Sequence, residues 1–248
     1  MNVFITGATA GFGTALARRF VREGHRVIAT GRRADRLQTL RDELGDMVLP
    51  LALDVRDAAA VERAVASLPG AFAEVDVLIN NAGLALGLEP AQRADAAGWE
   101  EMIDTNVKGV LHCTRVLLPG MVQRERGHVV MLGSVAAEFP YPGGNVYGAT
   151  KAFVHQLSLN LRADLLGTKV RVTCIEPGLC GGTEFSNVRF RGDDQKAASV
   201  YAGTEPLMPD DIAETVYWAV SRPAHVNINV ISLMPVCQAF GPLAVKRS

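Results

Sequence analysis

The stretch NVFITGATAGFG, residues 2–13, decides how this chain can fold. Its first five residues have the apolar character of a buried strand, and GATAGFG follows them directly. An amphipathic run that ends near Arg22 comes next, so the glycines lie at a strand-to-helix turn. Such a turn lets backbone N–H groups approach a pyrophosphate, which the positive end of the helix stabilises. The glycine spacing differs from the usual G-x-G-x-x-G fingerprint, and a turn without a ligand is the alternative interpretation.

The alternation of strand and helix continues along the chain. Further strands are predicted at residues 26–30, 48–53, 75–79, 128–132, 170–175 and 227–234. Helical runs separate them, including long ones at 98–124 and 147–166 and a last one starting at Pro209. Seven strands without hairpin signals predict an α/β protein with a single-domain Rossmann fold: a doubly wound, seven-stranded parallel sheet with helices on both faces. No linker or repeat divides residues 1–248.

Composition excludes several classes of function. A chain of 248 residues with 48% hydrophobic and 21% charged residues can bury one large core. Its net charge of −1 and its lack of basic runs argue against a nucleic-acid partner. We expect no membrane partner, because no apolar segment is long enough to span a bilayer and no signal peptide is recognisable. The four cysteines and five histidines lack metal-ligand spacing, so we expect no metal and a cytoplasmic protein.

Polar residues gather where the predicted strands end. Strand 26–30 runs into Arg32 and Arg33 without a carboxylate, which favours a ribose 2'-phosphate over a free 2'-hydroxyl. A solvated charge cluster is the alternative. The glycine turn, Asp54, the NNAG sequence at 80–83, Ser134 and Pro177 follow other strands. Because the carboxyl ends of parallel strands share one edge, we expect a single ligand site there.

A second decisive stretch is SVAAEFPYPGGNVYGATK, from Ser134 to Lys151. Tyr147 and Lys151 are four residues apart and would lie one helical turn apart on the same face. An ammonium group beside a phenol favours the phenolate, so we expect the pKa of Tyr147 to fall toward neutrality, where the residue can transfer a proton. The turn PYPGG can bring the Ser134 hydroxyl near the phenol. A surface Tyr–Lys pair at chance spacing is the alternative.

Two other features have more than one interpretation. Asn106 interrupts the apolar stripe of the helix predicted at 98–124, where an asparagine is most often a structural hydrogen-bonding residue but can also hold a water near an active site. Residues 179–200 have no clear periodicity and follow a strand end, so we interpret them as a mobile lid.

These motifs together resemble those of the short-chain dehydrogenase/reductase family along the whole chain. The resemblance rests on TGATAGFG, NNAG, Asn106, Ser134 with YGATK, and Pro177-Gly178. It implies a catalytic tetrad of Asn106, Ser134, Tyr147 and Lys151, in which Tyr147 is the general acid/base, Ser134 polarises the substrate oxygen and Asn106 keeps a relay water. Lys151 would lower the tyrosine pKa and bind the nicotinamide ribose.

The resemblance also implies NADP as cofactor. The cofactor would lie mainly on residues 1–133, and residues 134–248 would carry the catalytic and substrate groups. The residues expected to bind the cofactor are Gly7, Ala8, Thr9, Ala10, Gly11, Phe12, Gly13, Arg32, Arg33, Asp54, Val55, Asn80, Asn81, Ala82, Gly83, Tyr147, Lys151, Pro177, Gly178, Leu179 and Thr183.

A narrower resemblance concerns the substrate. The segments ATGRR, YPGGNVYGATKAF and EPGLCGGTEFSNVRF look like those of bacterial NADP-dependent 3-hydroxy acid dehydrogenases. Such enzymes act on L-serine, L-allo-threonine and 3-hydroxypropionate/malonic semialdehyde. Phe12 and the pair Gly181-Gly182 depart from the wider family pattern without removing a catalytic group.

For the substrate we expect Ser134, Gly144, Asn145, Tyr147 and Arg189 to form the site, with Arg189 binding the carboxylate. A broad carbonyl or 3-oxoacyl-thioester reductase is the alternative, and a non-catalytic NADP-binding sensor is a remote one, because all four tetrad positions are filled. The family also implies a homotetramer.

Overall fold

A computed structural model describes residues 1–241, and residues 242–248 of the predicted domain lie outside the described part. Seven parallel strands form one sheet in the order β3-β2-β1-β4-β5-β6-β7. The predicted single-domain Rossmann fold with a seven-stranded parallel sheet is confirmed. The strands are β1 (Asn2–Ile5), β2 (Arg26–Gly31), β3 (Val48–Ala52), β4 (Val77–Asn80), β5 (Gly127–Leu132), β6 (Val170–Pro177) and β7 (Val230–Leu233).

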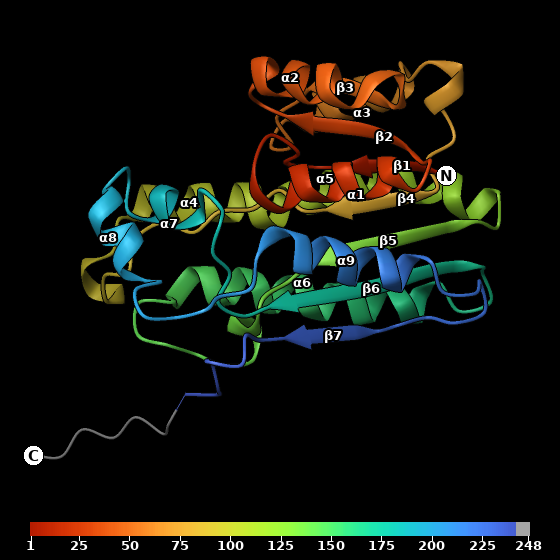
Figure 1. Ribbon diagram of the computed structural model, residues 1–248. Coiled ribbons are helices and arrows are strands. Elements are labelled where there is room, and N and C mark those ends of the chain that lie inside the picture. The colour runs from red at the N-terminus through yellow and green to blue at the C-terminus, as the bar shows by residue number, and fades with distance from the viewer. Residues whose placement is uncertain (242–248) are drawn as a thin grey trace, which may run out of the picture.

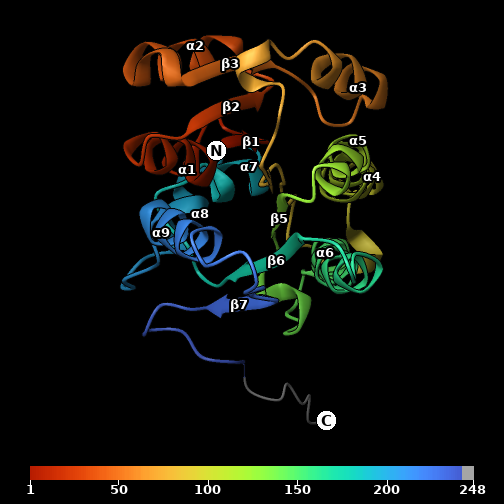
Figure 2. The ribbon, with the colours of Figure 1, turned by 90° about the vertical axis from the view of Figure 1, so that its right-hand side faces the viewer.

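Helices connect the strands and cover both faces of the sheet. They are α1 (Gly11–Arg22), α2 (Ala34–Leu44), α3 (Ala58–Ala66), α4 (Ala96–Ile103), α5 (Gly109–Gln123), α6 (Asn145–Asp164), α7 (Phe185–Arg189), α8 (Asp194–Ser199) and α9 (Pro209–Val220). Figure 2 shows α1 and α9 on one face and α3, α5 and α6 on the other. In Figure 1 the strands point toward the side where α7 and α8 lie, so this side carries the carboxyl ends. Among the described residues, no helix is both long and apolar enough to cross a membrane.

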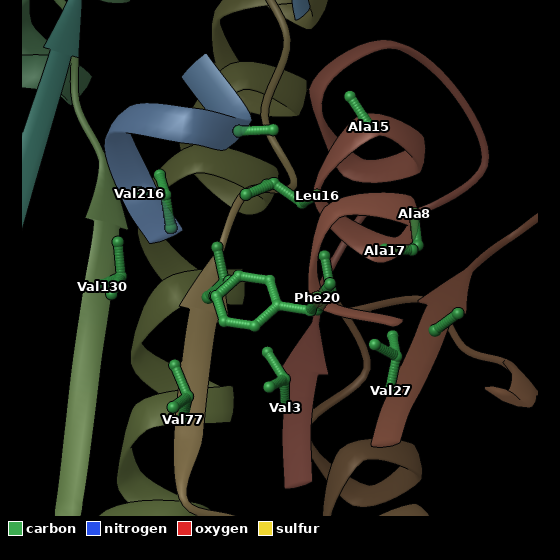
Figure 3. Close-up of a cluster of buried hydrophobic side chains, with 14 of the residues drawn as sticks. Val3, Ala8, Ala15, Leu16, Ala17, Phe20, Val27, Val77, Val130 and Val216 are labelled. Atoms are coloured by element: carbon green, nitrogen blue, oxygen red, sulfur yellow. The ribbon is translucent and has the colours of Figure 1, made fainter. Parts of the chain in front are cut away.

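Apolar side chains fill the space between the sheet and each helical layer. On one face, Phe20 and Leu16 of α1 pack with Val3 of β1 and Val216 of α9 (Figure 3). These side chains are fully buried. Because both faces are covered, β1, β4 and β5 are apolar at nearly every position, as parallel strands between two helical layers must be. The buried core therefore fixes where each strand ends, and with that the edge at which the polar residues meet.

The helical run predicted at 98–124 exists, but it is not α-helical throughout. The chain instead forms α4, then a π-helical turn at Asp104–Lys108, and then α5. Asn106 lies in the π-helical turn and is buried. A π-helical turn inserts an extra residue without ending the helix and is frequent at functional sites, which the apolar periodicity could not reveal.

The segment predicted as an aperiodic lid contains two short helices, α7 and α8. Asp193 caps the second helix, since its carboxylate accepts a hydrogen bond from the Lys196 backbone N–H. The polar sequence hid the helices because each is shorter than the periodic window that reveals one.

Candidate active site

One cavity, of about 760 Å³, runs along the carboxyl ends of the strands. This size is typical of ligand sites. Of the residues expected to bind cofactor or substrate, those lining it are Gly7, Thr9, Ala10, Gly11, Phe12, Arg32, Arg33, Asp54, Val55, Asn81, Ala82, Gly83, Ser134, Tyr147, Lys151, Pro177, Gly178, Leu179, Thr183 and Arg189. The predicted convergence of strand ends therefore holds in three dimensions.

The glycine turn forms one wall of the cavity. Gly7 and Gly11 both have positive φ angles, of 69° and 52°, which glycine adopts at little cost. A Cβ on Gly11 would lie 3.1 Å from Thr183 Cγ2, so a side chain there would crowd the opposite wall. The Asn81 amide donates to the carbonyls of Thr6 and Gly7 at 2.7 and 3.1 Å, which holds the turn against β4. The turn is a cradle that only glycine leaves open, as a bound pyrophosphate requires.

Two arginines line the far end of the cavity in different surroundings. Arg33 donates to Thr9 Oγ1 at 2.9 Å and forms an ion pair with Glu184 at 2.8 Å. Glu184 also pairs with Arg36 at 2.6 Å. Arg32 lines the cavity, and its side chain forms no hydrogen bond or ion pair within residues 1–241. It lies near Asp54, whose pKa is lowered mainly by the hydrogen bond of that carboxylate with Arg56. The cavity end therefore combines two cations, which suits a 2'-phosphate.

Tyr147 and Lys151 both reach the cavity from the first turns of α6. Their side chains are buried, and Lys151 Nζ donates to the Leu132 carbonyl at 2.7 Å. Its Nζ lies 5.9 Å from the centre of the Tyr147 ring. Ser134 follows β5 and its hydroxyl accepts a hydrogen bond from the Ala136 backbone at 3.1 Å. The PYPGG turn between Ser134 and α6 thus brings Ser134, Tyr147 and Lys151 to one side of the cavity.

The expected lowering of the Tyr147 pKa by Lys151 was wrong for this structure. Burial instead raises the pKa of Tyr147 to about 12, although the Ser134 hydroxyl and the Arg189 guanidinium each lower it. Burial also lowers the pKa of Lys151 to about 8, so the ammonium is easier to deprotonate than in water. The sequence showed that the two residues are neighbours but not that both are cut off from solvent, and desolvation dominates both pKa values.

Arg189 lies across the cavity from the sheet, among aromatic rings. Its guanidinium carbon lies 5.2 Å from the Tyr147 ring centre and 4.8 Å from the Phe185 ring centre. Its Nη2 donates to the Tyr141 hydroxyl at 3.1 Å. Its buried Nε has no hydrogen-bond partner among the described residues. The Arg189 cation, with one unused hydrogen-bond donor, therefore lies beside the Tyr147 phenol.

The segment that carries Arg189 is attached to the body of the protein at several points. The Gly87 backbone donates to the Arg189 carbonyl at 2.9 Å. Arg191 forms an ion pair with Asp95 before α4, and Glu184 forms those with Arg33 and Arg36. In Figure 1, α7 and α8 lie beyond the carboxyl ends of the strands. These contacts hold residues 184–191 over the cavity.

Asn106 does not face the cavity. Its amide Nδ2 donates to the Leu84 carbonyl at 2.8 Å and to Thr150 Oγ1 at 3.0 Å, while its Oδ1 accepts from the Leu84 backbone at 2.9 Å. The side chain therefore has the structural role that the sequence offered as one interpretation, and the binding of a relay water at Asn106 stays a prediction. Through its hydrogen bond to Thr150, Asn106 connects the π-helical turn to α6, in which Thr150 lies between Tyr147 and Lys151 in sequence.

Five other predicted site residues also lie outside the cavity. Asn80 is buried and donates to Thr114 Oγ1 at 3.0 Å. Ala8 is buried against β2, and a Cβ on Gly13 would lie 2.2 Å from the Gly7 carbonyl, so both serve packing. The Asn145 amide accepts from Trp99 and donates to Glu89, which turns it and the adjoining Gly144 away from the cavity.

Several cavity residues were missed in the sequence. Tyr141 and Phe185 enclose Arg189, and their aromatic character beside glycines and prolines was the available signal. Gln238 also lines the cavity and accepts from the Leu179 backbone at 2.6 Å. Gln238 is far in sequence from every motif, so nothing in the sequence indicated that it lines the cavity.

A buried tyrosine, a buried lysine and a serine beside a glycine-turn cavity define a class of dinucleotide-dependent oxidoreductases. Comparison agrees, because the family model for short chain dehydrogenase matches residues 1–193. The chain belongs to this family.

Individual relatives match over the full length. The chain is 63% identical to NADP-dependent 3-hydroxy acid dehydrogenase YdfG of Salmonella typhi, over 100% of both chains. It is 53% identical to the serine 3-dehydrogenase of Agrobacterium fabrum, over 99% of this chain and 98% of the relative. A solved closed form of serine dehydrogenase complexed with NADP+ has a TM-score of 0.99 and 60% identity, and the alignment covers 100% of both chains.

Proposed function

We propose that this protein is an NADP-dependent oxidoreductase that acts on the 3-hydroxyl of small 3-hydroxy acids or on the corresponding 3-oxo group. The observation that carries the proposal is the Arg189 guanidinium, 5.2 Å from the ring of the buried Tyr147. A hydroxy acid needs a proton-transferring group at its hydroxyl and a cation at its carboxylate, and this pair supplies both. The full-length relatives, a 3-hydroxy acid dehydrogenase and a serine 3-dehydrogenase, support the same substrate class.

The cavity fits NADP as the proposed cofactor. The pyrophosphate would lie at the open turn of Gly7 and Gly11, and the 2'-phosphate at Arg32 and Arg33. When bound, the nicotinamide supplies or accepts the hydride. Lys151, which is buried and bonded to the Leu132 carbonyl, is placed to bind the ribose.

The protein's own residues supply the proton and hold the substrate. We propose that the Tyr147 phenol gives its proton to the substrate oxygen in reduction and removes it in oxidation, while the Ser134 hydroxyl binds the same oxygen. Because burial raises the pKa of Tyr147 to about 12, the phenol carries its proton at neutral pH and is ready for reduction. Residues 179–200 would act as the lid that excludes water, held by the ion pairs of Glu184 and Arg191.

A substrate panel tests the proposal. Nucleotide absorbance should change with L-serine, L-allo-threonine or 3-hydroxypropionate, and much less with simple secondary alcohols or 3-oxoacyl thioesters of similar size. A thioester has no carboxylate at the position that Arg189 would bind, so a preference for thioesters would support the alternative reductase instead. Tight NADP binding without turnover of any substrate would point to the non-catalytic sensor.

Replacing Arg33 with alanine should lower the NADP/NAD ratio of kcat/KM by about tenfold, which corresponds to about 1.4 kcal/mol. The effect is moderate because the Arg33 side chain is 40% exposed. Kinetics with both cofactors measure the ratio. Arg36→Ala is the matched control, since Arg36 shares Glu184 but does not line the cavity. An equal loss in both variants would assign the effect to the Glu184 contact, and an unchanged ratio even in Arg32→Ala with Arg33→Ala would remove the proposed phosphate site.

A homotetramer is the proposed assembly, and the cytoplasm is the proposed compartment, where the four free cysteines would stay reduced. Leu111 on α5 and Trp218 on α9 are 40% and 47% exposed, and Phe240 is 65% exposed. Apolar side chains of this size at the surface favour contacts between copies. Light scattering at micromolar concentration should give four times the chain mass of 26.5 kDa. A monomer mass would contradict the assembly, and Trp218→Glu should shift the mass downward if α9 is part of the interface.

A further inference from the structure

A cluster of three metal-ligating side chains lies outside the cavity, one helical turn beyond the proposed catalytic lysine. Tyr147, Lys151 and His155 follow one another at intervals of four along one face of α6. Cys174 and Glu176 lie two apart on β6, so their side chains leave the same face of the sheet. This face of β6 meets α6, and it brings His155, Cys174 and Glu176 together.

The ligand atoms are close enough to share one ion. His155 Nδ1 lies 2.6 Å from Glu176 Oε1, and Cys174 Sγ lies 3.7 Å from the same oxygen. All three ligand atoms lie within 4.8 Å of one another. Around a tetrahedral Zn²⁺ with ligand distances of about 2.0 to 2.3 Å, ligand atoms are about 3.3 to 3.7 Å apart. The His155–Glu176 pair would open by less than an ångström around such an ion, and the His155 and Cys174 ligand atoms, which lie no more than 4.8 Å apart, would approach each other.

Glu176 supplies a second, independent observation. Its side chain is 0% exposed, and its Oε2 has no hydrogen-bond partner among the described residues. A buried carboxylate oxygen without a partner is costly, and an ion held by both Glu176 oxygens, Oε1 beside His155 and Cys174 and the unpartnered Oε2, would satisfy it. The His155 side chain is 21% exposed, so the cluster reaches the protein surface at this residue.

We propose that His155, Cys174 and Glu176 form a Zn²⁺ site with three protein ligands and a fourth position for water. An imidazole, a thiolate and a carboxylate are ligands that Zn²⁺ accepts together. Binding releases the Cys174 thiol proton, and the thiolate and carboxylate charges then balance the ion. That balance matters because Lys151, itself a cation, lies near enough to Cys174 to act on its thiol.

Cobalt titration of chelator-treated full-length protein tests the site, because Co²⁺ occupies zinc sites and a thiolate ligand gives an intense near-ultraviolet charge-transfer band. The band should appear at one equivalent of Co²⁺ and disappear when Zn²⁺ is added. Cys174→Ser should abolish the band. His155→Gln keeps a side-chain donor for the buried Glu176 carboxylate and should weaken Co²⁺ binding at least tenfold, and far-ultraviolet circular dichroism checks that the metal-free variant is folded.

Cys237→Ser is the matched control, since Cys237 is an exposed thiol far from the cluster in sequence, and it should keep the full band. A band that persists in Cys174→Ser, or that is lost in Cys237→Ser, would assign the metal to another cysteine and overturn the proposal. Absence of the band in folded wild-type protein would overturn it as well. The measurement reads metal binding and not turnover, so its outcome is independent of the proposed enzymatic function.

Discussion

Replacing Tyr147 with phenylalanine should reduce kcat by about 10²- to 10⁴-fold, the usual contribution of a general acid or base, while the dissociation constant for NADP stays nearly unchanged. The substitution removes one hydroxyl and keeps the ring, which packs edge-on against Phe185 at a centroid distance of 5.7 Å. Packing of the cavity wall should therefore survive. Steady-state kinetics and a fluorescence titration with NADPH measure the two quantities.

The pKa of Tyr147 adds a dependence on pH. Because burial raises this pKa to about 12, only a small fraction of the protein holds the phenolate that oxidation requires near neutral pH. That fraction grows as pH rises, so the rate of hydroxy acid oxidation should increase across the alkaline range. Reduction uses the protonated phenol, which is already dominant at neutral pH, and should not gain from the same change. Tyr147→Phe should remove the rise in the oxidation rate.

Tyr141→Phe is the matched control for this prediction. Tyr141 lines the same cavity and its hydroxyl accepts a hydrogen bond from Arg189, but it has no proposed role in proton transfer. It should keep most of its kcat. If Tyr147→Phe retained more than about a tenth of the wild-type rate, a group other than Tyr147 would have to move the proton.

The sequence was sufficient for the fold because the strands are nearly all apolar and end at glycines or polar residues. All seven predicted strands exist, and most boundaries shift by only one or two residues, as at β4, where 75–79 became Val77–Asn80. Asp57 caps α3, since its carboxylate accepts a hydrogen bond from the Ala60 backbone at 2.9 Å, and an aspartate just before a helix is a cap that local sequence can show. Each of these features depends on residues close together in sequence.

The parts that could not be predicted depend on side-chain direction and on solvent access. Asn80 and Asn81 are adjacent at the end of β4, yet one amide is buried against Thr114 and the other holds the glycine turn. Spacing could not show which amide faces the cavity. The prediction of a lowered Tyr147 pKa failed for a related reason, because the spacing of Tyr147 and Lys151 along α6 does not show how much water reaches the phenol.

Arg189→Ala should raise KM for L-serine or 3-hydroxypropionate by about 30-fold or more, because truncating one partner of a buried, hydrogen-bonded charge pair costs about 2 to 5 kcal/mol. The guanidinium is enclosed by the rings of Phe185, Tyr141 and Tyr147, so a carboxylate bound there would be shielded from water. Its unpartnered Nε is a donor that such a carboxylate can use. Turnover of an uncharged secondary alcohol should change little, since it has no charge for Arg189 to bind.

Arg191→Ala separates substrate binding from lid closure. Arg191 belongs to the same segment, but its guanidinium pairs with Asp95 outside the cavity. If residues 179–200 act only as a lid, both arginine variants should impair charged and uncharged substrates alike. If Arg189 binds the carboxylate, Arg189→Ala alone should discriminate between them, and the backbone hydrogen bond from Gly87 to the Arg189 carbonyl should keep the segment in place. If Arg189→Ala lost nothing on either substrate, the carboxylate would have to bind another cation. Arg32 is not a candidate for that cation, because it lies at the other end of the cavity, in the proposed phosphate site.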